Sequence, residues 1–362
     1  MINISLLDLV YEGLVVLIAG AMFWMVCWND VLEITDRQPN IRIRSQNCLH
    51  IATAADDVFL PGVIGLIKTT YRNSVMKSDS PFIRIQFEIF LTPNQSSESI
   101  KNLFSTDEAK ENNWSYRLHL IEPKDVQEYK NTRFSWHSGE EKRAVGDSDT
   151  PHIYVIHLLE KRLKDVNYVW YLESDVAMSK DIVKFMMYCT RNVEEKLELL
   201  ESPTKFLEEY GLPGKTFREN YGIAAFPRNI STVDASVYEK LEKLGYKVHG
   251  LPHFNSGILL LNLNLWRKRI INEELANLTK LNNKMGFWEG YGIQPALNLF
   301  FGDKNFYHLP KETTQMSLGC VTLENLRKSN VSNIESAYFL HWNGEYKPWL
   351  KNGMNKHLWA LD

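Results

Sequence analysis

The chain has 362 residues, of which 44% are hydrophobic and 23% charged, and this composition is typical of a globular protein with one large α/β domain or two smaller domains. The formal net charge of −3 and a pI near 6.4 argue against a nucleic-acid-binding protein, which would usually carry a basic face. Aromatic residues make up 12% of the chain, which suits a sugar-stacking surface and an ordinary core equally well.

The first predicted element is a membrane anchor. Residues 14–28 contain no charge, and extending the segment back to Leu6 adds only Asp8 and Glu12. The segment then has about the 20 residues that a membrane helix needs. A cleaved signal peptide would carry a basic first segment and a small-residue cleavage site, and neither is evident. We therefore expect a single signal anchor.

The signals for the orientation of this anchor conflict. No Lys or Arg precedes the span, whereas three arginines follow it, and that bias alone would place the C-terminal side in the cytoplasm. Asn-x-Ser/Thr sequons after the span favour a lumenal body if they are used. They begin at Asn94, Asn113, Asn229, Asn277 and Asn330.

Strands and helices are predicted to alternate from Cys48 onward. A strand that begins there ends in small residues and two acids, Asp56 and Asp57, and a helix should follow from Leu60 through Tyr71 because its apolar residues recur at helical spacing. Strands are also expected at 83–91, 115–121 and 221–227, a helix at 153–163, a mobile loop at 127–151, and a surface helix pair or an acceptor-binding lid at 193–210. This alternation predicts a largely parallel sheet whose ligands gather at the carboxyl ends of the strands.

The most informative stretch is the apolar, aromatic segment Val169–Val176, which reads as a buried strand and ends in Glu173 and Asp175. Because side chains alternate between the faces of a strand, the two carboxylates should point the same way and lie close enough to share one cation. Such triplets are common, however, so the alternative is that both acids are solvated or that one of them caps the next helix.

Two later segments place amide side chains beside apolar elements. Residues 251–263 read as a turn, with Asn255 and Ser256, that leads into a fully apolar strand. Gln294 opens a helix with Pro295 in its first turn, where the missing N–H costs little. The amide of Gln294 is then expected to be free to face a ligand. Taken alone, Asn255 would ordinarily be a turn residue.

Residues 338–349 read as a strand that stops at His341, followed by a glycine turn and Lys347. Taken alone, the histidine would ordinarily be a hydrogen-bonded residue at a strand end and the lysine a surface residue. Motifs of the GxGxxG, P-loop or GxSxG type are absent from the sequence, so nothing supports dinucleotide, Walker-type or serine-hydrolase chemistry.

The acid pair, Phe254-Asn255-Ser256-Gly257, Gln294 and the ending His341…Lys347-Pro348-Trp349 occur in an order that resembles glycosyltransferase family 8, a family of retaining GT-A enzymes. The resemblance runs from about Ile51 to Trp349. It implies an α/β GT-A fold, with a Rossmann-like mixed, mostly parallel sheet and flanking helices, and the N-terminal transmembrane helix predicted from hydropathy would precede this fold. The predicted domains are a cytoplasmic tail and signal-anchor helix at 1–29, a polar stem at 30–47 and a GT-A catalytic domain at 48–362.

The resemblance also implies which residues form the site. The metal ligands would be Glu173, Asp175 and His341, and this set of carboxylates and one imidazole suits Mn²⁺. Gln294 and Asn255 would be catalytic residues at the donor sugar. The residues that bind the nucleotide sugar would be Asp56, Ala54, Glu173, Ser174, Asn255, Ser256, Gly344 and Lys347. Among them Asp56 would hold the uracil edge, and Lys347 would place a positive charge on the diphosphate.

The first functional hypothesis is therefore a single-pass type II enzyme of the Golgi or ER membrane with a lumenal catalytic domain. It would transfer a hexose or xylose from a UDP-sugar to a glycan or glycoprotein acceptor, with Mn²⁺ and with retention of anomeric configuration. A second hypothesis is a catalytically impaired protein of the same fold that binds a sugar nucleotide or glycan. A third, a metal-dependent hydrolase, predicts no preference for uridine.

The second hypothesis rests on three departures from the family pattern. Glu173 replaces an aspartate and is one methylene longer. The family's Asp-Gln-Asp is Ile293-Gln294-Pro295 in this chain, and Ile156 stands where the family usually has an arginine.

Overall fold

The computed structural model describes residues 48–73, 84–92, 97–106, 114–130, 151–180, 185, 217, 219–289, 292–303, 305–329 and 332–359. The predicted anchor and stem, most of the predicted loop at 127–151 and the predicted helix pair at 193–210 lie outside these residues. Among the described residues, no helix combines the length and the hydropathy that a membrane span requires.

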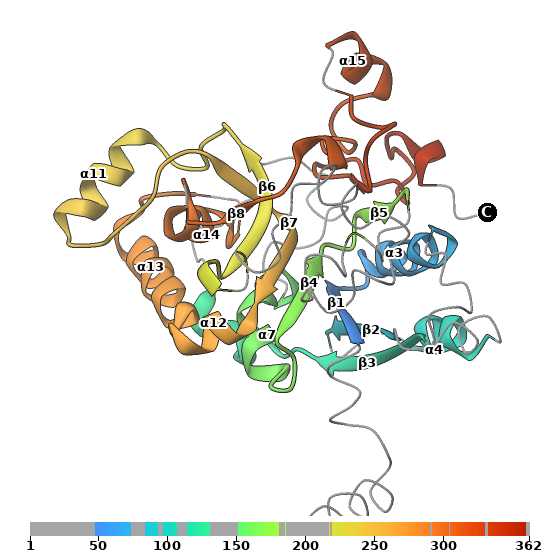
Figure 1. The fold of residues 1–362 in the computed structure, drawn as a ribbon, viewed down its shortest axis with the longest axis horizontal. Helices are drawn as coiled ribbons and strands as arrows, with labels where there is room; N and C mark the ends of the chain where they lie inside the picture. The colour runs from blue at the N-terminus through green and yellow to red at the C-terminus, as the bar shows by residue number, and fades with distance from the viewer. Residues whose placement is uncertain are drawn as a thin grey trace, which may run out of the picture. The chain divides into compact units, whose positions relative to one another are not determined.

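A seven-stranded sheet, in the order β3-β2-β1-β4-β7-β6-β8, forms the centre of the described unit (Figure 1). Its strands are β1 (Cys48–Ala55), β2 (Arg84–Leu91), β3 (Trp114–Leu120), β4 (Tyr168–Leu172), β6 (Ile223–Arg228), β7 (His253–Asn262) and β8 (Tyr307–His308). Strands β1 and β4 are parallel, as are β2 and β3, whereas β7 is antiparallel to both β4 and β6. The predicted mixed, mostly parallel sheet is confirmed.

Helices cover both faces of this sheet, because each helix has one apolar stripe to bury. In α3 three of the residues that predicted the helix, Val63, Ile67 and Thr70, are fully buried, whereas the fourth, Ile64, is half-buried. Helices α3 and α4 pack on one face, and α7 and α11–α14 on the other. The α-helices are α3 (Leu60–Asn73), α4 (Glu98–Ser105), α6 (Pro123–Val126), α7 (Ile156–Arg162), α11 (Ala235–Lys243), α12 (Leu263–Lys268), α13 (Ile271–Met285), α14 (Gln294–Phe301) and α15 (Leu323–Lys328).

A second, three-stranded sheet in the order β5-β10-β9 joins distant parts of the chain. Its strands are β5 (Val176–Met178), β10 (Phe339–His341) and β9 (Thr314–Gln315). Strand β10 is antiparallel to β5, and this register places His341 opposite Val176. The backbone N–H of Trp342 then donates to the carbonyl of Asp175 at 3.0 Å. The small sheet therefore carries His341 to the turn that follows β4.

Two predictions of local structure were wrong. Asn255 and Ser256 lie within β7 rather than in a turn, because β4 and β6 flank this strand and bury all ten of its residues. Burial in the sheet therefore outweighs the turn preference of these polar residues. The helix expected at 153–163 begins only at Ile156, after a 3-10 turn at Pro151–Tyr154. Further 3-10 turns lie at Gln127–Tyr129, Lys311–Thr313 and Lys356–Leu358.

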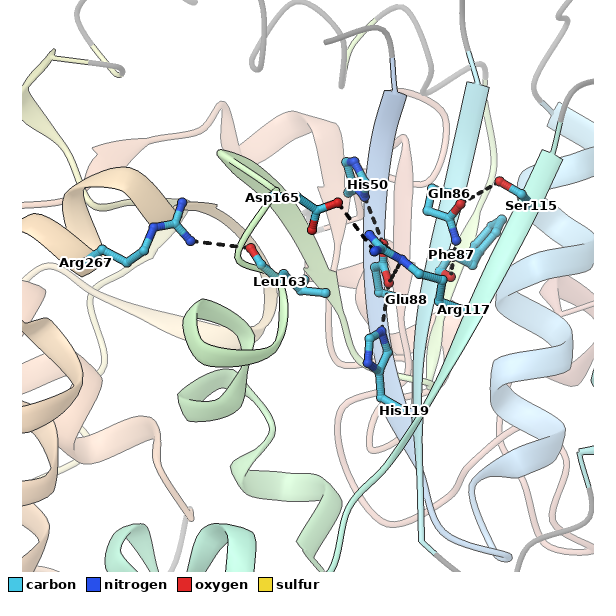
Figure 2. Close-up of polar contacts among 10 residues, drawn as sticks. All are labelled: His50, Gln86, Phe87, Glu88, Ser115, Arg117, His119, Leu163, Asp165 and Arg267. Atoms are coloured by element: carbon cyan, nitrogen blue, oxygen red, sulfur yellow. Dashed lines mark hydrogen bonds and ion pairs between the residues drawn. The ribbon is translucent and has the colours of Figure 1, made fainter. Parts of the chain in front are cut away.

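A buried carboxylate lies among strands β1, β2 and β3, and we call it and its three partners the Glu88 cluster (Figure 2). Glu88 is fully buried and accepts hydrogen bonds from His50 at 3.0 Å, from His119 at 2.8 Å and from the Arg117 guanidinium at 2.6 Å. Burial alone would raise the pKa of Glu88, but the bonds from His119, His50 and Arg117 lower it to about 2.

Candidate metal centre and donor site

Three side chains that the sequence predicted as metal ligands converge at the carboxyl end of β4. Glu173 and Asp175 lie in the turn between β4 and β5, and His341 ends β10. The Nε2 atom of His341 is 3.3 Å from Glu173 Oε2 and 3.2 Å from Asp175 Oδ1. One ligand atom from each residue lies within 4.8 Å of the other two, which is close enough for a single ion. The residues therefore form a candidate metal centre.

The hydrogen bonding of this centre fits a metal ion. His341 is fully buried and Asp175 is 3% exposed, yet neither ring nitrogen of His341 nor Oδ1 of Asp175 makes a hydrogen bond of normal geometry to any described residue. Buried polar atoms without partners are costly, and a bound cation would satisfy two of these three atoms, Asp175 Oδ1 and His341 Nε2. Carboxylate oxygens with one imidazole nitrogen suit a divalent ion that also binds phosphate oxygens.

The charges of this centre perturb one another. Burial alone would lower the pKa of His341, but the carboxylates of Asp175 and Glu173 raise it to about 9. Burial alone would raise the pKa of Asp175, and the charges of Lys347 and His341 instead hold it well below its usual range. Without a metal, the imidazole therefore carries the positive charge that the two carboxylates require.

Lys347 adds a second cation at the same place. Its ammonium donates to Asp175 Oδ2 and, at 3.1 Å, to the carbonyl of Trp342, and the residue is only 7% exposed. This lysine follows a turn in which Gly344 adopts φ +122°, a conformation that favours glycine. The turn brings Lys347 back over the candidate metal centre, where it is buried rather than on the surface.

Strand β7, which faces this centre, contains a glycine at position 257 because a side chain there would not fit. A Cβ at this position would overlap His341 Cε1 and lie 2.5 Å from Glu173 Oε2. The carbonyl of Gly257 also accepts a 2.8 Å hydrogen bond from the Glu173 backbone, which fixes the turn. Only a residue without a side chain lets β7 approach the metal ligands this closely.

The prediction that the Gln294 amide is free was wrong for its oxygen. Gln294 Oε1 accepts hydrogen bonds from Asn255 Nδ2 at 3.2 Å and from the Ser256 backbone at 3.1 Å. Asn298, one helical turn later on α14, bonds both backbone groups of Phe254 through its amide. The two amides bond backbone groups of β7 next to the point where the pairing of β6 and β7 shifts register, and this role was not foreseen from the sequence. Their spacing of four residues on one helix is the signal that could have indicated it.

Asp56 lies at the end of β1, where its carboxylate is held by the chain. Its Oδ1 accepts from the backbone N–H groups of Val58 and Phe59 at 3.0 and 3.1 Å. Its Oδ2 faces Nδ1 of His152 at 3.6 Å, and His152 packs on the ring of Phe59 with centroids 5.3 Å apart. Burial lowers the pKa of His152 despite the nearby carboxylate, so the imidazole is neutral at pH 7.

His152 and Phe59 were not identified as site residues from the sequence. A histidine in a charged, unpatterned segment has no local signal, and the fold alone brings it to Asp56. Phe59 also packs edge-on against Trp349 with centroids 5.8 Å apart, and the Lys347 ammonium lies 5.6 Å from its ring centroid. Phe59 therefore contacts both His152, which faces Asp56, and Lys347, so that one aromatic side chain lies between the two parts of the predicted site.

The remaining predicted residues are placed as follows. Ala54 is buried in β1, Ser174 lies 4% exposed between the two acids, and Ser256 lies 7% exposed in β7. Three of the departures from the family pattern are buried apolar residues: Ile156 is 1% exposed in α7, Ile293 is 6% exposed immediately before α14, and Pro295 is buried in the first turn of α14. Apolar packing therefore occupies the three positions where charge was expected, whereas Glu173 keeps its carboxylate.

Solved structures share this fold. The galactosyltransferase LgtC, in complex with donor and acceptor sugar analogues, is 16% identical, with a TM-score of 0.52 over 84% of this chain and 90% of that chain. The glycosyltransferase GlyE of Streptococcus pneumoniae TIGR4 is 13% identical, with a TM-score of 0.52 over 86% of this chain and 59% of that chain. At this level of identity the likeness concerns the fold alone.

Curated relatives match shorter segments. A probable galacturonosyltransferase-like protein 3 of Arabidopsis thaliana is 29% identical over 99 residues, which are 27% of this chain and 28% of the relative. Glycosyltransferase 8 domain-containing protein 1 of Danio rerio is 25% identical over 126 residues, which are 33% of either chain. The match therefore spans only about a third of each relative's length. The family model described as glycosyl transferase family 8 matches residues 50–353, and the chain therefore belongs to glycosyltransferase family 8.

Proposed function

We propose that the protein is a retaining glycosyltransferase that transfers a sugar from a UDP-sugar to a glycan or glycoprotein acceptor and depends on Mn²⁺. The observation that carries the proposal is the convergence of Glu173, Asp175 and His341, with ligand atoms of the two buried residues left without hydrogen bonds. When bound there, a divalent metal would supply Lewis-acid stabilisation of the leaving diphosphate.

The residues around the centre would bind and orient the donor. Asp56 would accept a hydrogen bond from the uracil through Oδ2, because Oδ1 is already held by two backbone N–H groups. Lys347 would place its charge on the diphosphate. Asn255 and Ser256, fixed by Gln294, would line the pocket of the donor sugar.

Retention of configuration would follow from substitution on the front face of the sugar. An uncharged amide is a poor nucleophile, and the oxygen of Gln294 is engaged by Asn255 and Ser256. The departing phosphate would therefore take the proton of the acceptor hydroxyl, and stabilisation of the developing charge would supply most of the rate.

A donor panel tests the proposal. UDP release by the full-length chain is measured with the UDP-linked forms of galactose, glucose, xylose and galacturonic acid, with Mn²⁺, with Mg²⁺ and with a chelator. We expect release from one donor that requires the metal. If the chain binds UDP and Mn²⁺ but neither hydrolyses nor transfers any of these sugars, the assignment as an enzyme fails.

A catalytically impaired protein is the second candidate, because Ile293 and Pro295 flank Gln294 with apolar side chains. It predicts UDP binding without turnover in the natural chain. It also predicts that Ile293→Asp combined with Glu173→Asp restores turnover. Turnover by the unaltered chain would exclude this candidate.

We further propose the membrane anchor at 1–29 and a lumenal location for the catalytic domain in the Golgi or ER. The sequon residues Asn229 and Asn277 are exposed, which would leave both accessible to glycosylation. Expression of the full chain in a eukaryotic cell, followed by endoglycosidase digestion, tests the location. A shift in mobility that Asn229→Gln and Asn277→Gln reduce is expected, whereas an unglycosylated chain would contradict it.

A further inference from the structure

A cavity of about 870 Å³ lies apart from the metal centre. Residues from four segments line it: 220–222 before β6; 244–247 and 249 after α11; 269, 271, 274 and 278 around the start of α13; and 300, 301 and 305 at the end of α14. Its volume falls within the range of roughly 300–1,000 Å³ that is typical of ligand sites. None of the residues of the predicted donor site lines it.

The strand register separates this cavity from the metal centre. The carbonyl of Gly222, in the cavity wall, accepts a hydrogen bond from the backbone of Asn262, the last residue of β7. Gly257, which contacts the metal ligands, lies five residues earlier on the same strand. At about 3.3 Å per residue the two places are about 17 Å apart. The cavity is therefore a separate site.

The charged side chains of the cavity are mostly basic. Lys247 and Arg269 line it with exposed side chains, and neither forms an ion pair with any residue in the described part of the chain. His249 Nδ1 accepts a 2.9 Å hydrogen bond from the Asn305 amide, so its other nitrogen carries the proton and can donate to a ligand. Glu274 is the one acidic residue of the lining. This arrangement favours an anionic ligand.

The aromatic side chains of the lining suit a sugar ring. Tyr221, Tyr246 and Phe300 contribute to the walls beside the basic residues. Aromatic rings offer apolar faces against which the C–H faces of a pyranose can pack, while tyrosine hydroxyls can hydrogen-bond its hydroxyl groups. The combination of aromatic surface with unpaired cations fits a carbohydrate that carries acidic groups.

The backbone next to Arg269 is strained. Ile270 adopts the left-handed conformation, with φ 47° and ψ 40°, and its side chain is 54% exposed. This conformation is unfavourable for a β-branched residue and tends to persist where function requires it. Its neighbours Arg269 and Ile271 both line the cavity, so the strained residue orients one wall.

We propose that this cavity binds a sugar segment that carries carboxylate, sulfate or phosphate groups. Lys247 and Arg269 pair with the acidic groups, and the aromatic residues pack against the rings. The proposal concerns a binding site separate from the donor site and does not rest on the proposed transferase function.

Binding of defined oligosaccharides to the full-length, metal-free chain tests this proposal without turnover. The probes are a tetragalacturonate, a sulfated tetrasaccharide and neutral maltotetraose, titrated at about 150 mM salt so that long-range attraction is screened. We compare Lys247→Gln/Arg269→Gln with a matched variant, Lys240→Gln/Lys284→Gln, which removes two exposed charges outside the cavity. The first variant should weaken binding of at least one acidic probe about tenfold, and the matched variant less than about twofold.

Removal of the acidic residue of the lining gives a second test, because its expected effect on affinity has the opposite sign. Glu274→Gln should strengthen binding of the same probe, because it removes the acid from the lining. The proposal is overturned if no acidic probe binds, if maltotetraose binds equally well, or if the matched variant loses as much affinity. UDP and Mn²⁺ titrations of the same samples report folding and the donor site. Absence of UDP binding would contradict the proposed function and leave the oligosaccharide result standing.

Discussion

The protein buries carboxylates in two places, and the partners of those carboxylates differ. In the Glu88 cluster, both oxygens of the acid accept hydrogen bonds from cationic or histidine side chains (Figure 2). At the metal centre, by contrast, Asp175 Oδ1 and both nitrogens of His341 make no normal hydrogen bond to any described residue. A fully satisfied buried acid stabilises the fold, whereas an incompletely satisfied one is available to a ligand.

The two places also differ in how their charges balance. Glu88 is one acid surrounded by Arg117 and two histidines. At the metal centre two acids, Glu173 and Asp175, lie beside the cations His341 and Lys347, and of these two acids only Asp175 forms an ion pair with Lys347 in the described part of the chain. Two nearby carboxylates favour a divalent cation, so this centre is expected to gain stability from a metal that the Glu88 cluster does not need.

The largest expected effect distinguishes Asp175 of the metal centre from Glu88 of the Glu88 cluster. Asp175→Asn should reduce UDP-sugar turnover about 10³-fold, because it removes a metal ligand and its charge. Glu88→Gln should leave turnover per folded molecule within about threefold. Initial rates at saturating donor and metal, normalised to the folded fraction, measure both. Equal losses of turnover in the two variants would contradict the distinction between a catalytic acid and a structural acid.

Gly257→Ala should lower Mn²⁺ affinity about 100-fold without changing any ligand, because the added methyl overlaps His341. Metal titration measures the effect. A matched Gly250→Ala variant, at a position where an added Cβ meets no atom within 4 Å, should bind the metal normally. Normal metal binding by Gly257→Ala would mean that β7 does not shape the centre.

Glu88→Gln should destabilise the fold by about 3 kcal/mol at pH 7, measured by urea unfolding. The folded pKa of Glu88, about 2, lies below the ordinary value of 4.5, so its stabilising contribution is complete above about pH 4.5 and is lost as the pH falls toward 2. The difference between variant and natural chain should therefore shrink at pH 3. A difference that grows on acidification would contradict this origin.

The smallest effect concerns His152, which faces Asp56. His152→Phe keeps an aromatic ring against Phe59 but removes the imidazole, and it should raise the KM for the UDP-sugar about tenfold with kcat little changed. Steady-state kinetics separate the two constants. A fall in kcat with an unchanged KM would place His152 in the chemical step instead.

Much of this site could be predicted because its residues end apolar strands. Strand periodicity indicates that Glu173 and Asp175 leave the core on the same face, whereas His341 was joined to them by the family resemblance alone. Pro295 likewise marked the start of α14. Periodicity and helix-start preferences act locally, so they can be read from the sequence.

The features that were missed depend on contacts between distant segments. The hydrogen bonds of Gln294 to Asn255 and Ser256 arise because a helix faces a strand 38 and 39 residues away in sequence. His50 and Glu88 are 38 residues apart. Neither contact leaves a local periodic signal, and a polar residue in a strand reads as a turn until its neighbours are known.

Calorimetric titration of Mn²⁺ into the full-length chain at pH 7, in two buffers of different ionisation enthalpy, tests the central claim most directly. Because the pKa of His341 is about 9 without metal, binding must displace its proton. The predicted result is one bound ion, about one proton released, and loss of both signals in His341→Gln. Absence of binding, or binding that His341→Gln leaves unchanged, would contradict a metal centre formed by Glu173, Asp175 and His341.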